Sequence, residues 1–311
     1  MDADMDTQKA GKRVDGFIVV AVLWILGALA TLASIYAIYV VDTAAAFSVH
    51  DDRLRAEAIV SAGLELTAYQ MTATPEDRPT RGAFTVRLGS ADVAVEFRSE
   101  AARVDLNSAP KELLAGLFTA LGARSSDAEV YADRVVGWRT APPEGQDPEA
   151  AAYRTAGRRH APRGNRFPHV NELGLVLGLP PALVERVLPF VTIYSGKPTI
   201  NALDAAPEVI AALPGMTPER LHAVLAQQRV VPQNPDYLMT LLGPTRSHAT
   251  AEGGKAVRVN VRIAFDNGRR MSSEVVIILF DDGAAEPFGV LSWRDELDEP
   301  SLAARARANL P

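Results

Sequence analysis

One uninterrupted apolar stretch constrains this chain more than any other feature. Residues 17–41, FIVVAVLWILGALATLASIYAIYVV, contain no Asp, Glu, Lys, Arg or His. At a rise of about 1.5 Å per residue, a helix of this length crosses a hydrocarbon core of about 30 Å. No other window is as long or as apolar, so the sequence predicts a single membrane-spanning helix with a large domain on one side.

The charges beside this stretch indicate its orientation. Lys9, Lys12 and Arg13 precede it, and Asp42 follows it. Because Lys and Arg favour the cytoplasmic flank, we expect a cytoplasmic N-terminus and a periplasmic C-terminal domain. Acidic residues in the leader dilute this signal. A secretory signal peptide has a shorter apolar core and a small-residue cleavage site after it, so cleavage after the stretch is not expected.

The junction before the apolar stretch carries a more specific signal. Lys12-Arg13-Val14-Asp15-Gly16 leads directly into Phe17. This junction resembles the leader of type IV prepilins. The resemblance implies that a prepilin peptidase cuts after Gly16 and that Phe17 becomes the methylated first residue of the mature chain. The simpler alternative is a helix that begins after a flexible glycine.

The fifth residue after this junction departs from the pilin pattern. Most pilins and pseudopilins carry a glutamate there, and this chain has Ala21. In that family the carboxylate is thought to neutralise the amine of a neighbouring subunit, which offsets a burial cost of about 2.5–3.5 kcal/mol. A subunit with no neighbour above it has no amine to neutralise. Chains with this pattern are similar to the K-type minor pseudopilins of type II secretion systems, which are large and placed at the tip.

This resemblance implies a function in assembly. The expected role is a structural component of the pseudopilus for protein export across the outer membrane, with no enzymatic activity. The expected partners are I- and J-type minor pseudopilins, the rest of the pseudopilus, the prepilin peptidase and the bacterial inner membrane. Nucleic acid is not among them, because a formal charge of −6 gives no general attraction for it. The absence of cysteine excludes disulfide bonds.

The segment after the membrane predicts a long helix followed by strands. Ile59, Ala62, Leu66 and Tyr69 have helical spacing before Pro75. One helix over 17–74 would be about 85 Å long if straight; two helices with a break near 42 or 51 are the alternative. Alternating runs then predict a hairpin, to which 102–106 could add, and three later strands. They are 83–88, 93–98, 256–265, 270–280 and 287–294.

The region between the two groups of strands has helical periodicity. It begins with LNSAPKELLAGLFTAL; a second helix, SSDAEVYADRVVGWRT, has a serine cap and an apolar set that includes Val130. We expect a loop over 141–166 and two short helices after it. The fold class is therefore α+β: a pilin-like N-terminal helix packed on an antiparallel sheet, with a large all-helical insertion. The expected divisions are 1–16, 17–41, 42–106, 107–242 (similar to SAM or helix-hairpin-helix domains) and 255–298.

An internal repeat marks two helix starts in this region. Residues 106–110, LNSAP, and 203–207, LDAAP, each place a polar residue before a proline at the first turn of an apolar helix, where it would cap free amides. Both resemble segments of K-type pseudopilins, and simple recurrence of a good helix start is the alternative. The second copy continues as AALPGMTPERLHAVLAQQR, which resembles a DNA-binding helix-hairpin-helix. A membrane-tethered DNA receptor is therefore the second functional hypothesis, although Arg220 and Arg229 are the only basic residues near it.

Catalytic and metal-binding patterns are scarce. The five histidines lack metal-ligand spacing, and the sequence has no phosphate-binding loop or nucleophile motif. A membrane-bound enzyme with an unrecognised site is a further alternative. The acidic turns at Asp281 and Asp282 and at Asp295 and Glu296 could supply oxygen ligands to calcium. We expect ordinary acidic turns with no metal or cofactor. The histidines are His50, His160, His169, His222 and His248.

Overall fold

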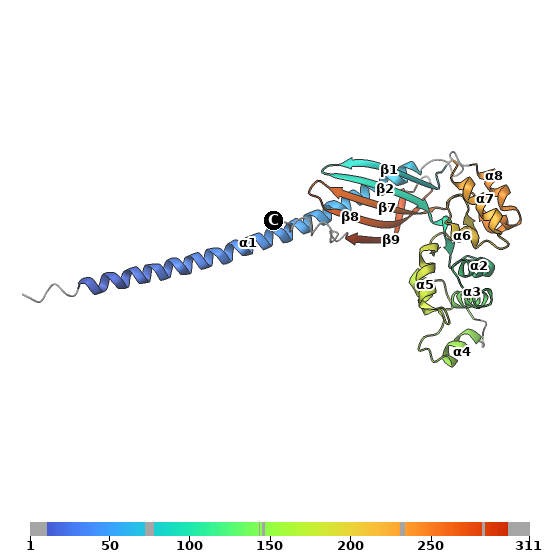
Figure 1. Cartoon of the computed structure of the whole chain (residues 1–311), viewed down its shortest axis with the longest axis horizontal. Coiled ribbons are helices and arrows are strands. Elements are labelled where there is room, and N and C mark those ends of the chain that lie inside the picture. The colour runs from blue at the N-terminus through green and yellow to red at the C-terminus, as the bar shows by residue number, and fades with distance from the viewer. Residues whose placement is uncertain are drawn as a thin grey trace, which may run out of the picture. The chain divides into compact units, whose positions relative to one another are not determined.

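A computed structural model describes residues 11–71, 78–142, 144, 147–230, 234–281 and 284–297 (Figure 1). The chain divides into two compact units, residues 1–58 and residues 59–311, and each is described by itself. Helix α1, Gly11–Gln70, belongs to both units.

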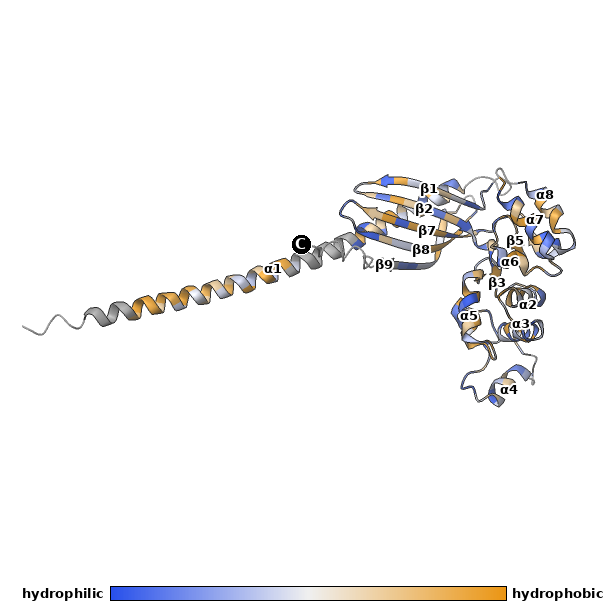
Figure 2. Cartoon of the chain, viewed as in Figure 1, coloured by the Kyte–Doolittle hydropathy of each residue, from blue (hydrophilic) through white to orange (hydrophobic). Residues whose placement is uncertain are grey.

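Helix α1 is continuous, although the sequence was compatible with either one long helix or two helices. It passes through 42 and 51 without a break, begins before Phe17 and ends at Gln70, before the predicted end at 74. Within the first unit, the apolar stretch Phe17–Val41 has no buried side chains. Figure 2 shows it as the mostly orange part of α1.

The second unit is built on one five-stranded antiparallel sheet of order β1-β2-β7-β8-β9, so the predicted hairpin and the three later strands join as expected. The central pairing joins β2 to β7, with Val95 opposite Val261. The strands are β1 (Arg81–Leu88), β2 (Ala91–Ser99), β7 (Ala256–Phe265), β8 (Arg270–Leu279) and β9 (Phe288–Leu297).

The end of α1 within the second unit packs on one face of this sheet. A Cβ added to Gly63 would lie 3.3 Å from Cγ2 of Val95 and 3.6 Å from Cγ2 of Val261. The buried side of the helix is Val60, Leu64, Thr67, Ala68 and Met71. The predicted apolar side was wrong, because Tyr69 is 76% exposed and Leu66 38% exposed. Gly63 lies on the buried side and lets the helix backbone approach Val95 and Val261 closely, whereas Leu66 and Tyr69 point away from the sheet.

The helical region lies between β2 and β7 and has its own core, in which Leu113, Phe118, Tyr153, Phe167 and Ile210 are fully or almost fully buried. Its α-helices are α2 (Lys111–Ala120), α3 (Ser125–Arg139), α4 (Pro148–Thr155), α5 (Pro181–Val187), α6 (Pro207–Ala211), α7 (Pro218–Gln228) and α8 (Pro235–Leu242). Its 3₁₀ turns are η1 (Glu100–Ala102), η2 (Val170–Leu175), η3 (Leu188–Phe190) and η4 (Gly243–His248). Its short strands are β3 (Val104–Asp105), β4 (Val191–Thr192), β5 (Ile200–Asn201) and β6 (Ala249–Thr250).

The helical region is an internal duplication. In the first copy β3 leads through a turn to α2, and β4 returns parallel to β3; in the second, β5 leads to α6, and β6 returns parallel to β5. The amide of Leu106 donates to the carbonyl of Thr192 over 2.8 Å, and the amide of Ala202 donates to that of Thr250 over 2.9 Å. The repeat is therefore structural and not a mere recurrence of helix starts.

The two helix starts of the repeat are built differently from the prediction, which expected a polar side chain to cap the first amides of each helix. Asp105 Oδ1 accepts from the amide of Asn107 over 2.7 Å, and Asn201 Oδ1 accepts from the amide of Leu203 over 2.9 Å. These are Asx turns, which form before the helices begin. The N-caps of α2 and α6, Pro110 and Ala206, have no side-chain cap. The equivalent residues are thus Asp105 and Asn201, so the aligned prolines were out of register by one position.

Three other local predictions were wrong. Residues 102–106 supply β3, which pairs with β4 and not with the large sheet. The expected loop over 141–166 contains α4, because Asp147 caps it and Pro148 starts it. Helix α3 has Arg124 as its N-cap and no serine cap, and Val130 is 52% exposed.

The chain leaves the sheet and rejoins it at one point. Ser99, the last residue of β2, accepts with its Oγ from the amide of Ala101 over 3.2 Å. The same Oγ accepts from the amide of Gly254 over 2.9 Å, just before β7. The two ends of the helical region are therefore held together by one buried hydroxyl.

Candidate functional site

The residues of the predicted leader junction lie within α1. Gly16 and Phe17 have helical backbone, and the Phe17 side chain is 76% exposed. Ala21 follows on the same helix. Glycine is a poor helix former, so Gly16 is the least costly place at which to unwind this segment for a peptidase. Cleavage after Gly16, and the meaning of Ala21, stay predictions.

The apolar stretch presents large side chains outward throughout its length. Trp24 is 77% exposed, and Leu23 and Ile25 are exposed to a similar degree. The stretch has a mean hydropathy of 2.5 over 25 residues. Such a surface is stable in a lipid bilayer or against other apolar helices and is costly in water. By length and composition, this helix is suited to cross a membrane.

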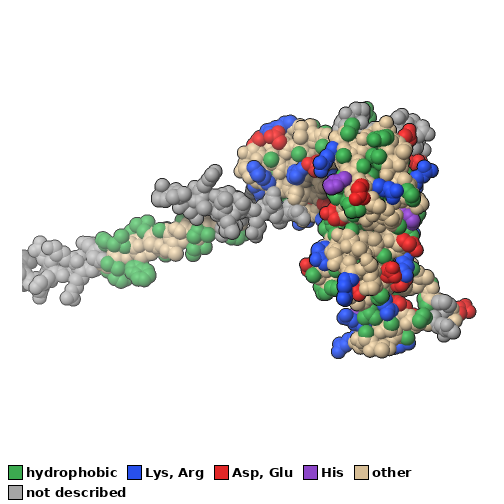
Figure 3. All heavy atoms as spheres, turned by 45° about the vertical axis from the view of Figure 1, so that its right-hand side comes forward, with side chains coloured by type: hydrophobic (Ala, Val, Ile, Leu, Met, Phe, Trp, Pro, Cys, Tyr) green, Lys and Arg blue, Asp and Glu red, His purple; other side chains and the backbone are tan. Residues whose placement is uncertain are grey.

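The segment that resembles a helix-hairpin-helix does form two helices. Gly215 has a φ of +76° in the turn between α6 and α7, a conformation that favours glycine. Thr217 Oγ1 accepts from the amide of Arg220, so one of the first amides of α7 is already capped. In the face seen in Figure 3, basic and acidic side chains are interspersed over the second unit. On this face, such an arrangement gives no large electropositive field of the kind that phosphate backbones require.

The acidic turns have protein partners where they are described. Asp281 Oδ2 accepts from Lys255 Nζ over 2.6 Å, and this hydrogen bond lowers the pKa of Asp281. Asp295 Oδ1 accepts from Ser273 Oγ over 2.7 Å and from Trp293 Nε1 over 2.6 Å. Asp282 and the side chain of Glu296 lie outside the described residues. Among the described residues, no group of three His, Asp or Glu could hold a metal ion.

Four of the five histidines are dispersed over the second unit, and His50 belongs to the first. His160 Nε2 lies 3.0 Å from the carbonyl of Leu175, and its ring stands edge-on to Trp138 and Tyr153. His169 Nδ1 accepts from the amide of Asn171, and His248 Nδ1 lies 2.9 Å from Ser247 Oγ. His222 lies on α7, and the side chain of His50 is outside the described residues. These contacts bring no two of the described histidines together.

Sequence reasoning missed a buried ionic cluster between the sheet and the first copy. The Glu100 side chain is 1% exposed; its Oε1 accepts from Arg258 Nε over 2.7 Å and its Oε2 from Arg258 Nη2 over 3.2 Å. Glu100 also accepts from Thr192 Oγ1, and Glu274 accepts from Arg258 Nη1. The signal in the sequence was weak. Arg258 is one of several polar residues on β7, and Glu100 comes directly after the end of β2.

This cluster shifts the pKa values of Arg258 and Arg103 in opposite directions. Burial lowers the pKa of Arg258, but its hydrogen bonds and attraction to Glu100 and Glu274 outweigh burial and raise the pKa overall. Burial lowers the pKa of the neighbouring Arg103, and repulsion by Arg258 adds to that effect. The cluster therefore fixes β4, β7 and β8 to one another through a single paired cation.

Part of the chain is similar to a known protein family. Residues 94–196 match the family model described as Type II secretion system (T2SS), protein K. This matched segment is called the protein K domain below. This domain begins within β2, includes Glu100 and the whole first copy of the duplication, and ends before β5.

The fold around the protein K domain also has a solved relative. The structure is similar to a chain in the crystal structure of the GspK-GspI-GspJ complex from the type 2 secretion system of enterotoxigenic Escherichia coli. The TM-score is 0.55 at 15% identity, over 79% of this chain and 98% of that chain. At this identity the likeness shows the fold alone, and it agrees with the predicted α+β class. A search of curated proteins gives no match.

The protein K match, together with the apolar helix, supports a minor component of a type II secretion pseudopilus. Such components are structural parts of a secretion system.

Proposed function

We propose that this chain is the K-type minor pseudopilin at the tip of a type II secretion pseudopilus. The observation that carries the proposal is the protein K domain, which follows in the sequence an apolar helix long enough to cross a membrane. The chain would be anchored in the inner membrane, with its N-terminus in the cytoplasm and its second unit in the periplasm. A prepilin peptidase would cut it after Gly16. Its role would be assembly, without catalysis and without a metal or cofactor.

The partners in this proposal are I- and J-type minor pseudopilins. The similar solved chain was crystallised with GspI and GspJ, which supports an equivalent set of partners here. Tip placement is supported by Ala21, because a subunit without the family glutamate has no carboxylate to offer to a subunit above it.

Co-purification tests the proposal. The full chain, expressed with the I- and J-type subunits of the same system and extracted in detergent, should elute with them as one complex. A matched control replaces one partner with a major pseudopilin, which should not co-elute to the same extent. Elution of the chain alone, with both partners present and folded, would contradict the proposal.

DNA binding is the alternative that the same preparation can test. The α6–α7 hairpin is the observation in its favour. A DNA receptor would bind a duplex with a steep dependence on salt and would lose affinity in Arg220→Ala. We expect no such binding at low salt in a mobility-shift titration. Tight, salt-sensitive binding that Arg220→Ala abolishes would favour the receptor.

A further inference from the structure

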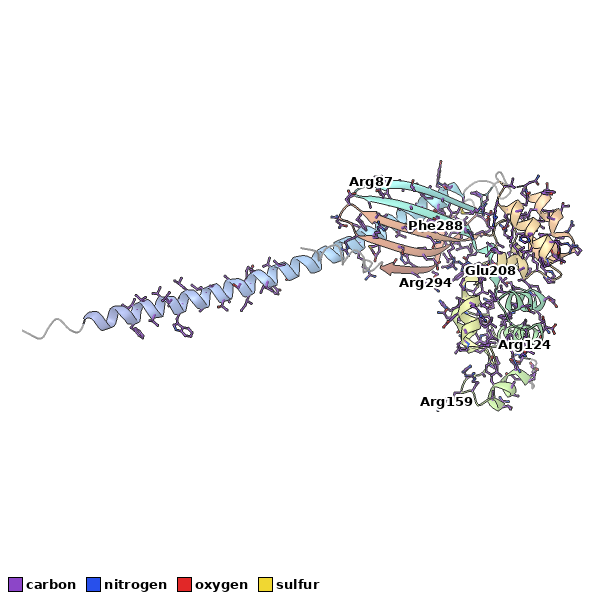
Figure 4. The ribbon with its side chains drawn as sticks, in the orientation of Figure 1. Arg87, Arg124, Arg159, Glu208, Phe288 and Arg294 are labelled. Atoms are coloured by element: carbon purple, nitrogen blue, oxygen red, sulfur yellow. The ribbon has the colours of Figure 1, made fainter. Side chains whose placement is uncertain are left out.

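A small cavity lies at the junction between the sheet and the first copy of the duplication. Its volume is about 90 Å³, and it is largely enclosed. Arg258 on β7, with Ser292 and Arg294 on β9, lines it from the sheet; Arg103 and His169 line it from the helical region. Figure 4 shows Arg294 on β9 beside the helical region. The cavity is separate from the leader junction and from the α6–α7 hairpin.

Positive charge exceeds negative charge around this cavity. Three arginines line it, and Glu100 and Glu274 are both committed to Arg258. Among the described acids, only Glu100 lies within 4.0 Å of Arg103, at 4.0 Å from its Nε. The Arg103 side chain is 28% exposed. A mostly buried guanidinium at that distance from an already shared carboxylate is poorly neutralised, which is costly.

The ring of His169 faces two hydrogen-bond donors. The amide of Asn171 donates to His169 Nδ1 over 3.1 Å, while Arg294 Nη2 lies 3.2 Å from His169 Nε2. A neutral imidazole has one N–H and one lone pair, so it cannot accept from both groups. If Nδ1 accepts from Asn171, an N–H on Nε2 points at the N–H of Arg294. An acceptor that contacts both nitrogens from one side, within the cavity, would satisfy both N–H groups.

We propose that this cavity binds a small oxyanion: phosphate, sulfate or a carboxylate. One oxygen would accept from His169 Nε2 and Arg294, and another would accept from Arg103. The Ser292 hydroxyl supplies a further donor at the wall. Guanidinium groups suit this ligand class because their planar fork matches paired oxygens. The volume admits one such ion and excludes a nucleotide or a folded peptide segment.

Charge distinguishes an anion from water at this position. A water molecule can accept from His169 and Arg294, but it leaves Arg103 with only the distant Glu100, which Arg258 already shares, as a counter-charge. An oxyanion meets both needs. It also bridges residues of β9 to residues of the helical region, so its binding stabilises the junction between them by mass action.

Thermal unfolding of the full chain in detergent, followed by tryptophan fluorescence, tests the proposal. Potassium phosphate and potassium acetate are titrated against potassium chloride at equal ionic strength. We expect an oxyanion to raise the Tm saturably by roughly 2–4 °C relative to chloride. An effect of phosphate alone assigns a tetrahedral ion, and an equal effect of acetate assigns a carboxylate.

Two variants and one control test whether the rise in Tm comes from binding in this cavity. Arg103→Gln and Arg294→Gln should each lose the oxyanion-specific rise. Arg262→Gln should keep it, because Arg262 is an exposed residue of the same sheet that pairs with Glu96 outside the cavity. Arg294 is exposed, so its variant should fold even if Arg103→Gln does not. An equal rise with chloride, or a rise that persists in Arg294→Gln, would overturn the proposal.

Discussion

Glu100 is the residue on which the junction between sheet and helices depends most. Its replacement by glutamine removes the main counter-charge of Arg258, whose side chain is 13% exposed. Because Glu274 still pairs with that arginine, we expect Glu100→Gln to lower the free energy of unfolding by about 3 kcal/mol, the lower end for a broken buried pair. Urea denaturation of the full chain in detergent measures this change.

The matched control is Glu96→Gln. Glu96 pairs with Arg262 on the exposed side of the same sheet, with side chains 55% and 60% exposed. Loss of such a pair changes stability by about 0–1 kcal/mol. Equal effects of the two substitutions would show that the Glu100 cluster is not the fixing point described above.

Gly16 tests whether the leader junction is processed. If a prepilin peptidase acts there, the membrane form begins at Phe17 with a methylated amine, and Gly16→Asp accumulates uncut. Mass spectrometry of the N-terminus decides between these forms. A mature chain that begins at Met1, or beyond the apolar helix near Ala45, would contradict the pilin interpretation.

Ala21 tests the proposed position in the fibre. A glutamate at this position would be a buried charge without an amine to neutralise. The expected effect of Ala21→Glu on secretion is nevertheless mild, since the large helical region would also prevent a subunit from stacking above. Secretion assays in a strain complemented with the variant measure this. A complete loss of secretion with normal protein levels would show that the missing carboxylate has another meaning.

Helix α1 and the sheet depend on a close approach at Gly63. A Cβ added there would lie only 3.3 Å from Cγ2 of Val95, so a leucine must displace the helix or the strand. We expect Gly63→Leu to lower the free energy of unfolding by about 1–3 kcal/mol through overpacking. Glu65→Leu on the exposed side of the same helix is the control, and it should be close to neutral. Denaturation curves of both variants decide the matter.

The sequence predicted where helices and strands lie better than it predicted which of their side chains are buried. Regular alternation in 256–265 located β7 without error, because a sheet with one buried face imposes a period of two. The apolar side of α1 could not be read in the same way. Two sets of apolar residues have helical spacing there: Val60, Leu64 and Ala68 are buried, whereas Leu66 and Tyr69 are exposed. The close approach of Gly63 to the sheet decides between them, and the helix pattern alone does not show it. Helix α4 was hidden for a different reason, because Pro, Gly and Arg around it are typical of a loop. Contacts with α3 hold it in place: Tyr153 packs against Trp138, and Glu149 pairs with Arg134.

The candidate sites also differ in how far the sequence could predict them. The apolar helix and Gly16-Phe17 are local patterns, so one stretch of sequence was enough to propose them. The cluster of Glu100 and Arg258 joins residues far apart in the chain. No local pattern relates them, and the pairing appears only when β7 lies beside β2.

Tip placement makes a prediction about the assembled pseudopilus. A labelled copy of the chain should be seen at one end of each pilus by electron microscopy. Deletion should reduce secretion or initiation and leave the major subunit stable. Label along the shaft would contradict the proposal. A labelled major subunit provides the control, since it should decorate the whole length.

The shared hydroxyl of Ser99 has a consequence for how the chain matures. Strands β2 and β7 are hydrogen-bonded neighbours, yet the whole helical region is synthesised between them. At about 5–20 residues per second, the ribosome needs on the order of 10–30 s to make that region. For this time the edge of β2 that later pairs with β7 is unpaired, and an unpaired strand edge favours aggregation. The time taken to make the helical region and return the chain to Ser99 therefore sets how long this edge stays open.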